Sequence, residues 1–189
     1  NVGERGKFGK GFPVREQEGH TPFIVHVPGG GSGRSDIFVQ PQDAFATVCG
    51  IAEVEPPEDI DSRDVLTIAR EGRGEPREIA LSGHPLRPNM KENPHQAFCT
   101  VFADTWYLEM GARPESCRLT RQGTLEDVSA DNADVVERLH AAGLDELERR
   151  GMDPTLVDWM RAGAEGEFPE DACFFDGFPG PSGYYSYFS

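Results

Sequence analysis

The first twenty residues of the chain contain the side chains best suited to chemistry on an anion. Lys7 and Lys10 are two of the three lysines in the sequence, and glycines stand around them at positions 3, 6, 9 and 11. A lysine ammonium is a compact charge that can donate to negative charge developing on an ester oxygen. His20 could bind an oxyanion oxygen or transfer a proton. These residues define the candidate site, although most loop lysines and histidines are simply solvated.

The other histidines are weaker candidates. His26 falls inside the apolar run 23–27, where we expect a hydrogen-bonded core histidine. His84 and His95 lie in proline-flanked loops and could line a substrate entrance, although such residues are more often ordinary surface histidines.

The four cysteines exclude some kinds of redox and metal chemistry. None of them forms a C-x-x-C pair, which excludes a zinc knuckle and a thioredoxin-like site. We expect buried thiols in apolar segments, with one or two disulfides left open. The residues are Cys49, Cys99, Cys117 and Cys173.

The charge balance excludes two classes of partner. The chain has 189 residues, 18 basic against 33 acidic, for a net charge of −15. No lysine- and arginine-rich surface is therefore available for nucleic acid or for an anionic membrane. No apolar stretch approaches the roughly 18–20 residues of a membrane helix. The chain begins at Asn1 without a methionine, so the lack of a visible signal peptide leaves the compartment unknown.

The residues that follow the candidate site, 23–58, have the pattern of alternating strands and helices. The run 23–27 is bounded by Pro22 and Pro28, which is typical of a strand buried on both faces of a sheet. Residues 36–39 predict a brief extended segment. Pro41 then begins a helix that carries Phe45, Val48, Cys49 and Ala52 at helical spacing and that ends at the Glu-Pro-Pro-Glu of residues 55–58.

The polar stretch 71–77 is the best boundary, and the pattern changes beyond it. Residues 78–82 read as a strand, and residues 97–103 and 106–110 read as two strands that face each other across a turn without glycine. The clearest helix spans 133–150, with Asp131 as its cap, Gly151 after its end, and a buried stripe of Val135, Leu139, Ala142 and Leu147. The tail from residue 165 is acidic and then aromatic, and we expect it to lie on a domain surface.

Three segments in series resemble the type I sulfatases of the alkaline-phosphatase superfamily. GERGKFGKG at 3–11, continuing through REQEGHTPFIVHVPG at 15–29, resembles G-E-H-G-x-W-G-K-G and then Y-E-E-x-x-R/H-V-P-x-I-V-x-x-P-G. DIFVQPQDAFATVCGIAEVEPPEDIDSRDVL at 36–66 resembles V-S-x-x-D-L-x-P-T-L-L-x-L-A-G-V-x-x-P-x-x-x-D-G-x-S-L. GTLEDVSADNADVVERLHAAGLDEL at 123–147 resembles D-P-x-E-x-x-N-L-A-x-x-P-E-V-x-x-x-L-x-x-x-L. Arg5 replaces the usual His, and Arg15 stands where Tyr is usual.

The resemblance implies roles for individual residues. Lys10, the lysine of G-K-G, would contact a sulfate oxygen and act in catalysis. His20 stands where many relatives have Arg and where the phosphonate monoester hydrolase branch has His; it would bind substrate or transfer a proton. His84 would be a further substrate-binding residue. Glu16 matches the second acidic position of Y-E-E and would support Lys10 or the neighbouring backbone, whereas Lys7 matches a variable position.

Two parts of a sulfatase centre are missing from the sequence. The family's nucleophile is a formylglycine made from the first residue of C/S-x-P/A-x-R, and no cysteine or serine here fits that pattern. Cys117, in CRLTR at 117–121, comes nearest but has leucine where proline or alanine is required. The family's Ca²⁺ ligands would lie before Asn1, so we assign no metal ligand to this chain. Oxygen ligands suit this hard cation.

We therefore expect an α/β protein with an alkaline-phosphatase-like sulfatase fold. Residues 1–72 would be the tail of the large mixed-sheet catalytic domain, 73–163 a small C-terminal α+β subdomain with antiparallel strands and a covering helix, and 164–189 an aromatic-rich tail. The chain would be the C-terminal portion of a sulfatase acting on a small-molecule sulfate ester, with the missing N-terminal portion as its partner and no activity alone. A phosphonate monoester or phosphodiester hydrolase, and a non-catalytic binding module, remain alternatives; the oligomeric state is open.

Overall fold

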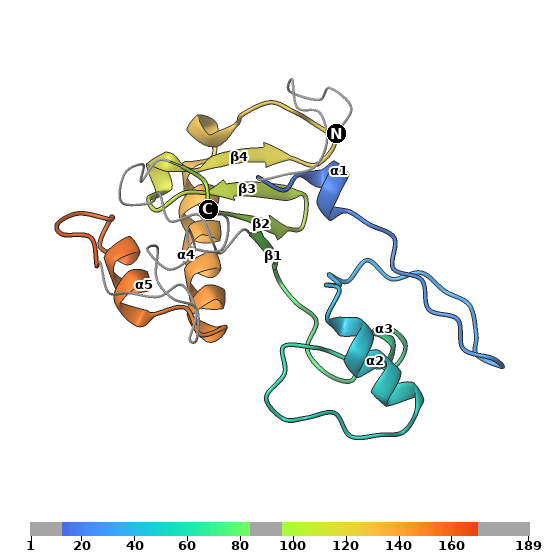
Figure 1. The fold of residues 1–189 in the computed structure, drawn as a ribbon. Helices are drawn as coiled ribbons and strands as arrows, with labels where there is room; N and C mark the ends of the chain where they lie inside the picture. The colour runs from blue at the N-terminus through green and yellow to red at the C-terminus, as the bar shows by residue number, and fades with distance from the viewer. Residues whose placement is uncertain (1–12, 84–95, 170–189) are drawn as a thin grey trace, which may run out of the picture. The chain divides into compact units, whose positions relative to one another are not determined.

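The structure is a computed structural model that describes residues 13–83 and 96–169 (Figure 1). The chain divides into two compact units, of which one comprises residues 1–20 and 81–189 and the other comprises residues 21–80. The domains expected at 1–72, 73–163 and 164–189 stay a prediction.

A four-stranded sheet forms the centre of the first unit. Its strands follow one another in sequence order, and β2 pairs antiparallel with β3, as β3 does with β4. Together with the helices this sheet makes the chain a mixed α/β protein. The strands are β1 (Ala80–Gly83), β2 (Cys99–Ala103), β3 (Trp106–Met110) and β4 (Arg118–Arg121).

The hairpin predicted for residues 97–103 and 106–110 is confirmed by β2 and β3. Ala103 pairs with Trp106, so only Asp104 and Thr105 form the turn. Asp104 has φ 48°, in the left-handed region that aspartate tolerates better than most residues with a side chain. The tight turn therefore forms without glycine.

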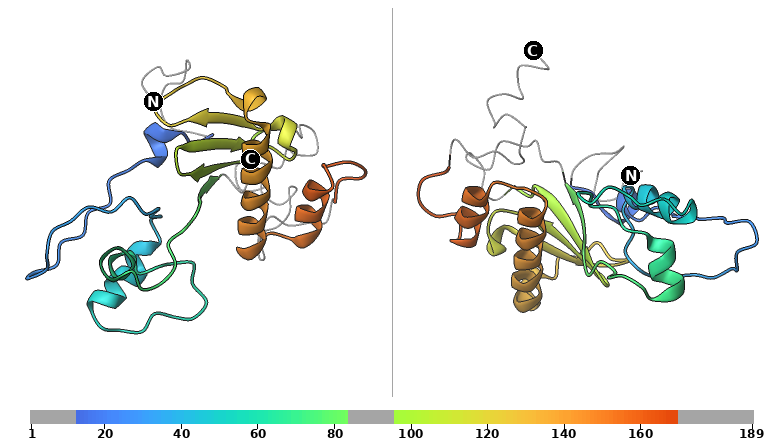
Figure 2. Two further views of the ribbon diagram at one scale, coloured as in Figure 1. Left: turned by 180° about the vertical axis from the view of Figure 1, so that it is seen from behind. Right: turned by 90° about the horizontal axis from the view of Figure 1, so that it is seen from below.

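Helix α4 (Ala133–Arg149) covers one face of this sheet. It lies behind the strands in Figure 1 and in front of them in the reverse view of Figure 2. A Cβ atom on Gly143 of α4 would lie 2.7 Å from the Met110 sulfur and 3.0 Å from a Val101 methyl, so a residue without a side chain is needed at this crossing. Below the helix, Val101, Leu108, Met110 and Leu119 are completely buried and form the core.

The predicted helix over 133–150 is confirmed, but two of its details were wrong. Leu139 and Leu147 are buried as expected, whereas Val135 and Ala142 are only half-buried because the stripe is rotated toward Val136, His140, Gly143 and Leu144. Asp131 does not cap the helix, because it ends a short 3₁₀ turn and Asn132 takes the cap position without a side-chain cap hydrogen bond.

A second helix, α5 (Pro154–Arg161), packs beside α4 and was not predicted. The Asp153 carboxylate accepts a hydrogen bond from the Thr155 backbone at its start, and Pro154 occupies its first position. Leu156, Val157 and Met160 are buried. The signals of an N-cap followed by proline were present in the sequence, in a segment short enough to pass as a loop.

The second unit contains α2 (Asp43–Ile51) and α3 (Val65–Glu71), together with a single antiparallel bridge between Phe38 and Arg77. The helix predicted after Pro41 is confirmed, but its apolar residues do not form a core. Phe45 is 53% exposed and Val48 is 62% exposed. The buried side of α2 is instead formed by Asp43, Ala46 and Thr47.

The strand expected over residues 23–27 is not present in the structure. These residues have no ladder partner in the part of the chain that the structure describes, and Ile24 is 89% exposed. His26 is exposed as well, so it is not the core histidine that the apolar run predicted. A strand buried on both faces needs neighbouring strands, and residues 21–79 form no strand ladder that this run could join. No helix among the described residues is long and apolar enough to cross a membrane.

Candidate functional site

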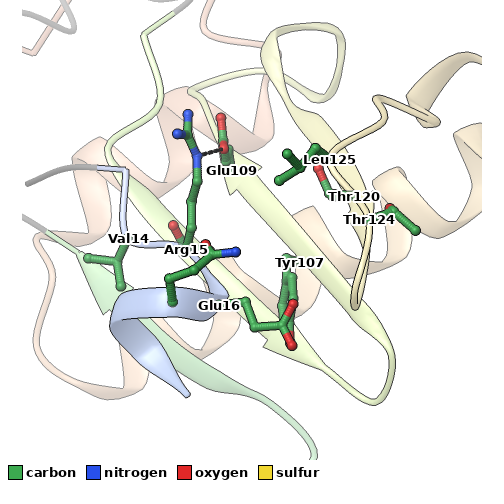
Figure 3. A pocket seen from close by; sticks show the side chains of 10 residues that line it. Val14, Arg15, Glu16, Tyr107, Glu109, Thr120, Thr124 and Leu125 are labelled. Atoms are coloured by element: carbon green, nitrogen blue, oxygen red, sulfur yellow. Dashed lines mark hydrogen bonds and ion pairs between the residues drawn. The ribbon is translucent and has the colours of Figure 1, made fainter. Parts of the chain in front are cut away.

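The segment 13–20 lies on the face of the sheet opposite to α4, which we call the open face. Residues alternate across a strand, so Thr100, Tyr107, Glu109 and Thr120 point away from α4. The segment contains the short helix α1 (Glu16–Gly19), and Figure 3 shows its Glu16 beside Tyr107 of β3. It places the chain that follows the Gly-Lys-Gly motif directly against the sheet.

Arg15 and Glu109 form an ion pair on the open face. The Arg15 Nε donates to the Glu109 Oε1 over 3.0 Å, and both side chains are largely buried, with 17% and 13% exposure (Figure 3). A charge-assisted hydrogen bond of this kind is stronger than one between neutral groups. It joins two residues that are 94 positions apart in the sequence.

Glu16 makes a second contact with the sheet. Its carboxylate accepts a hydrogen bond of 3.0 Å from the backbone N–H of Gly123, which has φ +76° in the turn after β4. Burial, and to a smaller extent the charge of Glu16, raise the pKa of Tyr107 to about 12. Further along the segment, a Cβ atom on Gly19 would come within 2.7 Å of the Phe102 ring, so α1 needs glycine to approach the sheet this closely.

A small hollow lies between α1 and the open face. The side chains of Arg15, Thr100, Tyr107, Glu109 and Thr120 are among those that line it (Figure 3). Thr100 is 1% exposed, and its hydroxyl has no hydrogen-bond partner among the described residues. The hollow measures about 20 Å³, room for about one water molecule, and is too small for a sulfate ester. We conclude that it is part of the packing beneath α1 and not a substrate pocket.

Of the residues predicted for the site, the structure brings His20 and Glu16 together. The His20 Nδ1 lies 3.9 Å from the Glu16 Oε1, one helical turn away, and the His20 side chain is 66% exposed. His20 is therefore accessible to a ligand and has a carboxylate beside it. Lys10 and His84 lie outside the described residues, as do Lys7 and His95.

Cys117, which comes nearest to a formylglycine motif, is a structural residue. Its thiol is buried and donates to the backbone carbonyl of Arg113 at 3.3 Å. Burial raises its pKa to about 12, which leaves almost no thiolate at neutral pH. Cys49, Cys99 and Cys117 are all free thiols.

The described residues do not form a metal centre. Over 13–83 and 96–169, no three histidine, cysteine, aspartate or glutamate side chains converge as a metal site would require. The resemblance places the calcium ligands at positions before Asn1.

Sequence reasoning missed the partners of the segment 13–20. Arg15 was noted only as a departure from the family's tyrosine, and Glu109 and Gly123 were not singled out. The alternation of β3 could have placed Glu109 on the open face, but nothing in the sequence indicated which segment would cover that face.

Comparison with protein-family models, with curated proteins and with solved structures gave no match to this chain.

Proposed function

We propose that this chain is the C-terminal portion of a sulfatase and that Lys10 contacts the sulfate group of the substrate. The observation that carries the proposal is the motif at residues 3–29, where glycines surround Lys10 and an apolar run ends in Pro28 and Gly29. Two further segments, 36–66 and 123–147, follow in the order that the resemblance requires.

The architecture of the first unit agrees with this proposal. The resemblance implies a C-terminal subdomain with antiparallel strands and a covering helix, and β2, β3 and β4 with α4 have this arrangement. A four-stranded antiparallel sheet with a helix occurs in many unrelated proteins, so this agreement supports the fold more than the activity.

The exposed apolar side chains of the second unit also support the proposal. Phe45, Val48 and Ile51 recur at helical spacing on α2 and are each more than 40% exposed. Phe23 and Ile24 are exposed as well. Apolar surface of this kind usually marks an interface. In a sulfatase, residues 21–80 would be covered by the rest of the catalytic domain.

The chain would contribute charge and hydrogen bonds to the reaction. The Lys10 ammonium would donate to a sulfate oxygen, where negative charge grows as the ester bond to the alcohol breaks. His20 would bind a second oxygen or transfer a proton, with the Glu16 carboxylate 3.9 Å away. His84 would face the substrate. Formylglycine and Ca²⁺ would supply the nucleophile and the polarising charge from residues outside this chain.

The first experiment is the intact mass of the native protein, purified from its source and assayed on an aryl sulfate. We expect a mass above 20.8 kDa. We also expect a peptide that is lighter than its sequence predicts, because the thiol of one cysteine has been converted to an aldehyde. Lys10→Ala in that protein should lower kcat/KM by about 10²-fold or more, the usual loss for one charge-stabilising donor. A native mass of 20.8 kDa, or an active isolated chain, would refute the proposal.

A phosphonate monoester or phosphodiester hydrolase is the second candidate, and His20 favours it. The resemblance puts histidine at this position in that branch, and the exposed side chain of His20 can reach a ligand. The ratio of kcat/KM on an aryl sulfate to that on a phenyl phosphonate monoester separates the two activities. A ratio well below one, shifted toward sulfate by His20→Arg, would favour the second candidate.

A further inference from the structure

Two contacts attach the segment 13–20 to parts of the chain that are distant in sequence. The Arg15–Glu109 ion pair reaches β3 of the sheet (Figure 3). The hydrogen bond between Glu16 and the Gly123 backbone reaches the turn after β4. The residues joined are 94 and 107 positions apart. We call these two contacts together the anchor.

The anchor differs from an ordinary surface ion pair because its charges are largely removed from water. The side chains of Arg15 and Glu109 are 17% and 13% exposed, whereas those of the Arg34–Asp36 pair are 88% and 85% exposed. Exposed pairs contribute little because water and salt screen them. A largely buried pair is screened much less, so removing either charge weakens the contact between the segment and the sheet.

We propose that Arg15 and Glu109 are positioning residues for Lys10, because they hold the segment 13–20, which follows Lys10 in the sequence, against the C-terminal sheet; this inference rests on the proposed role of Lys10. In the sequence, Lys10 stands five positions before Arg15. An ion pair that fixes Arg15 therefore fixes the chain a few residues after Lys10.

The same contact explains a departure from the sulfatase pattern. Arg15 stands where the resemblance has tyrosine, and in this chain the guanidinium is matched by the Glu109 carboxylate on β3. The Arg15 charge is therefore paired with a carboxylate of the sheet, which distinguishes Arg15 from a substrate-binding arginine. His20, which lies one turn after Glu16, is held by the same anchor.

The anchor can be tested in the 189-residue chain without any enzyme assay. Hydrogen–deuterium exchange of peptides that cover residues 13–20 is measured in the wild type, Arg15→Gln and Glu109→Gln. Both variants should exchange at least about tenfold faster over these residues, because fixing them requires the ion pair, while amides of α4 keep their protection. Arg34→Gln is the matched control and should leave residues 13–20 unchanged.

Charge reversal distinguishes a pairing role from general damage to the fold. Arg15→Glu and Glu109→Arg should each loosen the segment, and the double variant should recover most of the protection. Unchanged exchange over 13–20 in Arg15→Gln and Glu109→Gln would overturn the anchor. The anchor would also be overturned if the single variants lost protection from exchange in α4 as well as in residues 13–20 and the double variant did not recover it.

Kinetics in the longer native protein test the link to Lys10. Glu109→Gln should lower kcat on an aryl sulfate by about 10²-fold with a smaller change in KM, as expected when a catalytic group is misplaced by about 1 Å. In the double variant with Lys10→Ala, Glu109→Gln should lower kcat no further, since both changes remove the same function. No effect of Lys10→Ala would refute the proposed function and leave the exchange result intact. Loss of activity in Lys10→Ala but not in Glu109→Gln would refute the positioning role alone.

Discussion

The carboxylate of Asp43 and the guanidinium of Arg77 form an ion pair that is almost completely removed from solvent. The Arg77 Nη1 lies 2.5 Å from the Asp43 Oδ2, and the two side chains are 2% and 0% exposed. The same carboxylate accepts hydrogen bonds from the backbone N–H groups of Gln40 and Arg63, at 2.7 and 2.9 Å. Arg77 Nη2 also donates to the Asp61 carbonyl. One side chain at the start of α2 therefore holds together three separate segments of the second unit.

Replacing Asp43 with asparagine should unfold or severely loosen this unit. The amide has nearly the same shape but leaves the Arg77 charge buried without a counter-ion, a change that costs about 3–5 kcal/mol. Urea unfolding, monitored by hydrogen exchange over residues 40–77, measures the loss in the free energy of unfolding. Asp36→Asn breaks the exposed pair with Arg34 and should change stability by less than about 1 kcal/mol. Equal effects of the two variants would contradict a structural role for the buried pair.

The contact between α2 and α3 depends on Gly50. A Cβ atom at this position would lie 2.9 Å from the Asp64 Cγ and closer still to its Oδ2. Asp64 caps α3 by accepting from the backbone N–H groups of Leu66 and Thr67. Gly50→Ala should therefore destabilise the unit by about 1–3 kcal/mol, even though alanine favours a helix over glycine.

Gly33→Ala provides the control for this prediction. A Cβ atom at Gly33 meets nothing within 4 Å, so the variant should stay within about 0.5 kcal/mol of the wild type. Thermal unfolding of both variants measures the difference. A Gly50→Ala protein as stable as Gly33→Ala would show that Asp64 can move aside at no cost.

The sequence predicts the first unit better than the second for a physical reason. Helix α4 and the hairpin of β2 and β3 are set by local patterns, an apolar stripe and an alternation, that need no distant partner to be recognised. The errors in α4 are small shifts, from Val135 to Val136 and from Asp131 to Asn132, because helix ends and stripe phases are decided by packing.

In the second unit, local patterns and burial disagree. The apolar spacing of Phe45 and Val48 predicts a buried face of α2, but the buried face contains Asp43 and Thr47, whose partners are far along the chain. A buried carboxylate cannot be found from spacing, since its burial depends on Arg77. The segment 13–20 is a similar case, because its contact with Glu109 is set by the tertiary fold.

The three described cysteines should differ in their reaction with iodoacetamide. Burial, with a smaller contribution from Cys117, raises the pKa of the Cys99 thiol well above its ordinary value, and the pKa of Cys117 rises to about 12. Because only the thiolate reacts, both should be alkylated at least about 10²-fold more slowly in the folded chain than in urea at pH 8.

Cys49 is half-buried and should be modified first, and peptide mass mapping separates the sites. Rapid alkylation of Cys117 in the folded chain would mean that the edge of the sheet opens readily. It would also restore Cys117 as a candidate for chemistry.

His140 should make the stability of the first unit fall as the solution is acidified. Its side chain lies in the core beneath α4, with Nε2 3.2 Å from the Gly111 carbonyl. Burial lowers the pKa of His140, against the opposing effects of hydrogen bonds at Gly111 and Ala112 and of the charge of Glu115. The folded state therefore prefers the neutral imidazole, whereas the unfolded chain binds a proton near pH 6.5.

Between pH 6.5 and the lower folded pKa, the unfolded state binds more protons, so the free energy of unfolding decreases as the pH falls through this window. Urea unfolding from pH 8 to pH 5 measures the slope. His140→Gln should flatten it, while exposed His26→Gln should not. Glu146 does not interfere: although burial raises its pKa, hydrogen bonds from Arg149 and Arg150 lower it overall to about 2, so its contribution is lost only below about pH 4.5. A slope in His140→Gln equal to that of the wild type would show that another group, and not the buried imidazole, causes the acid sensitivity.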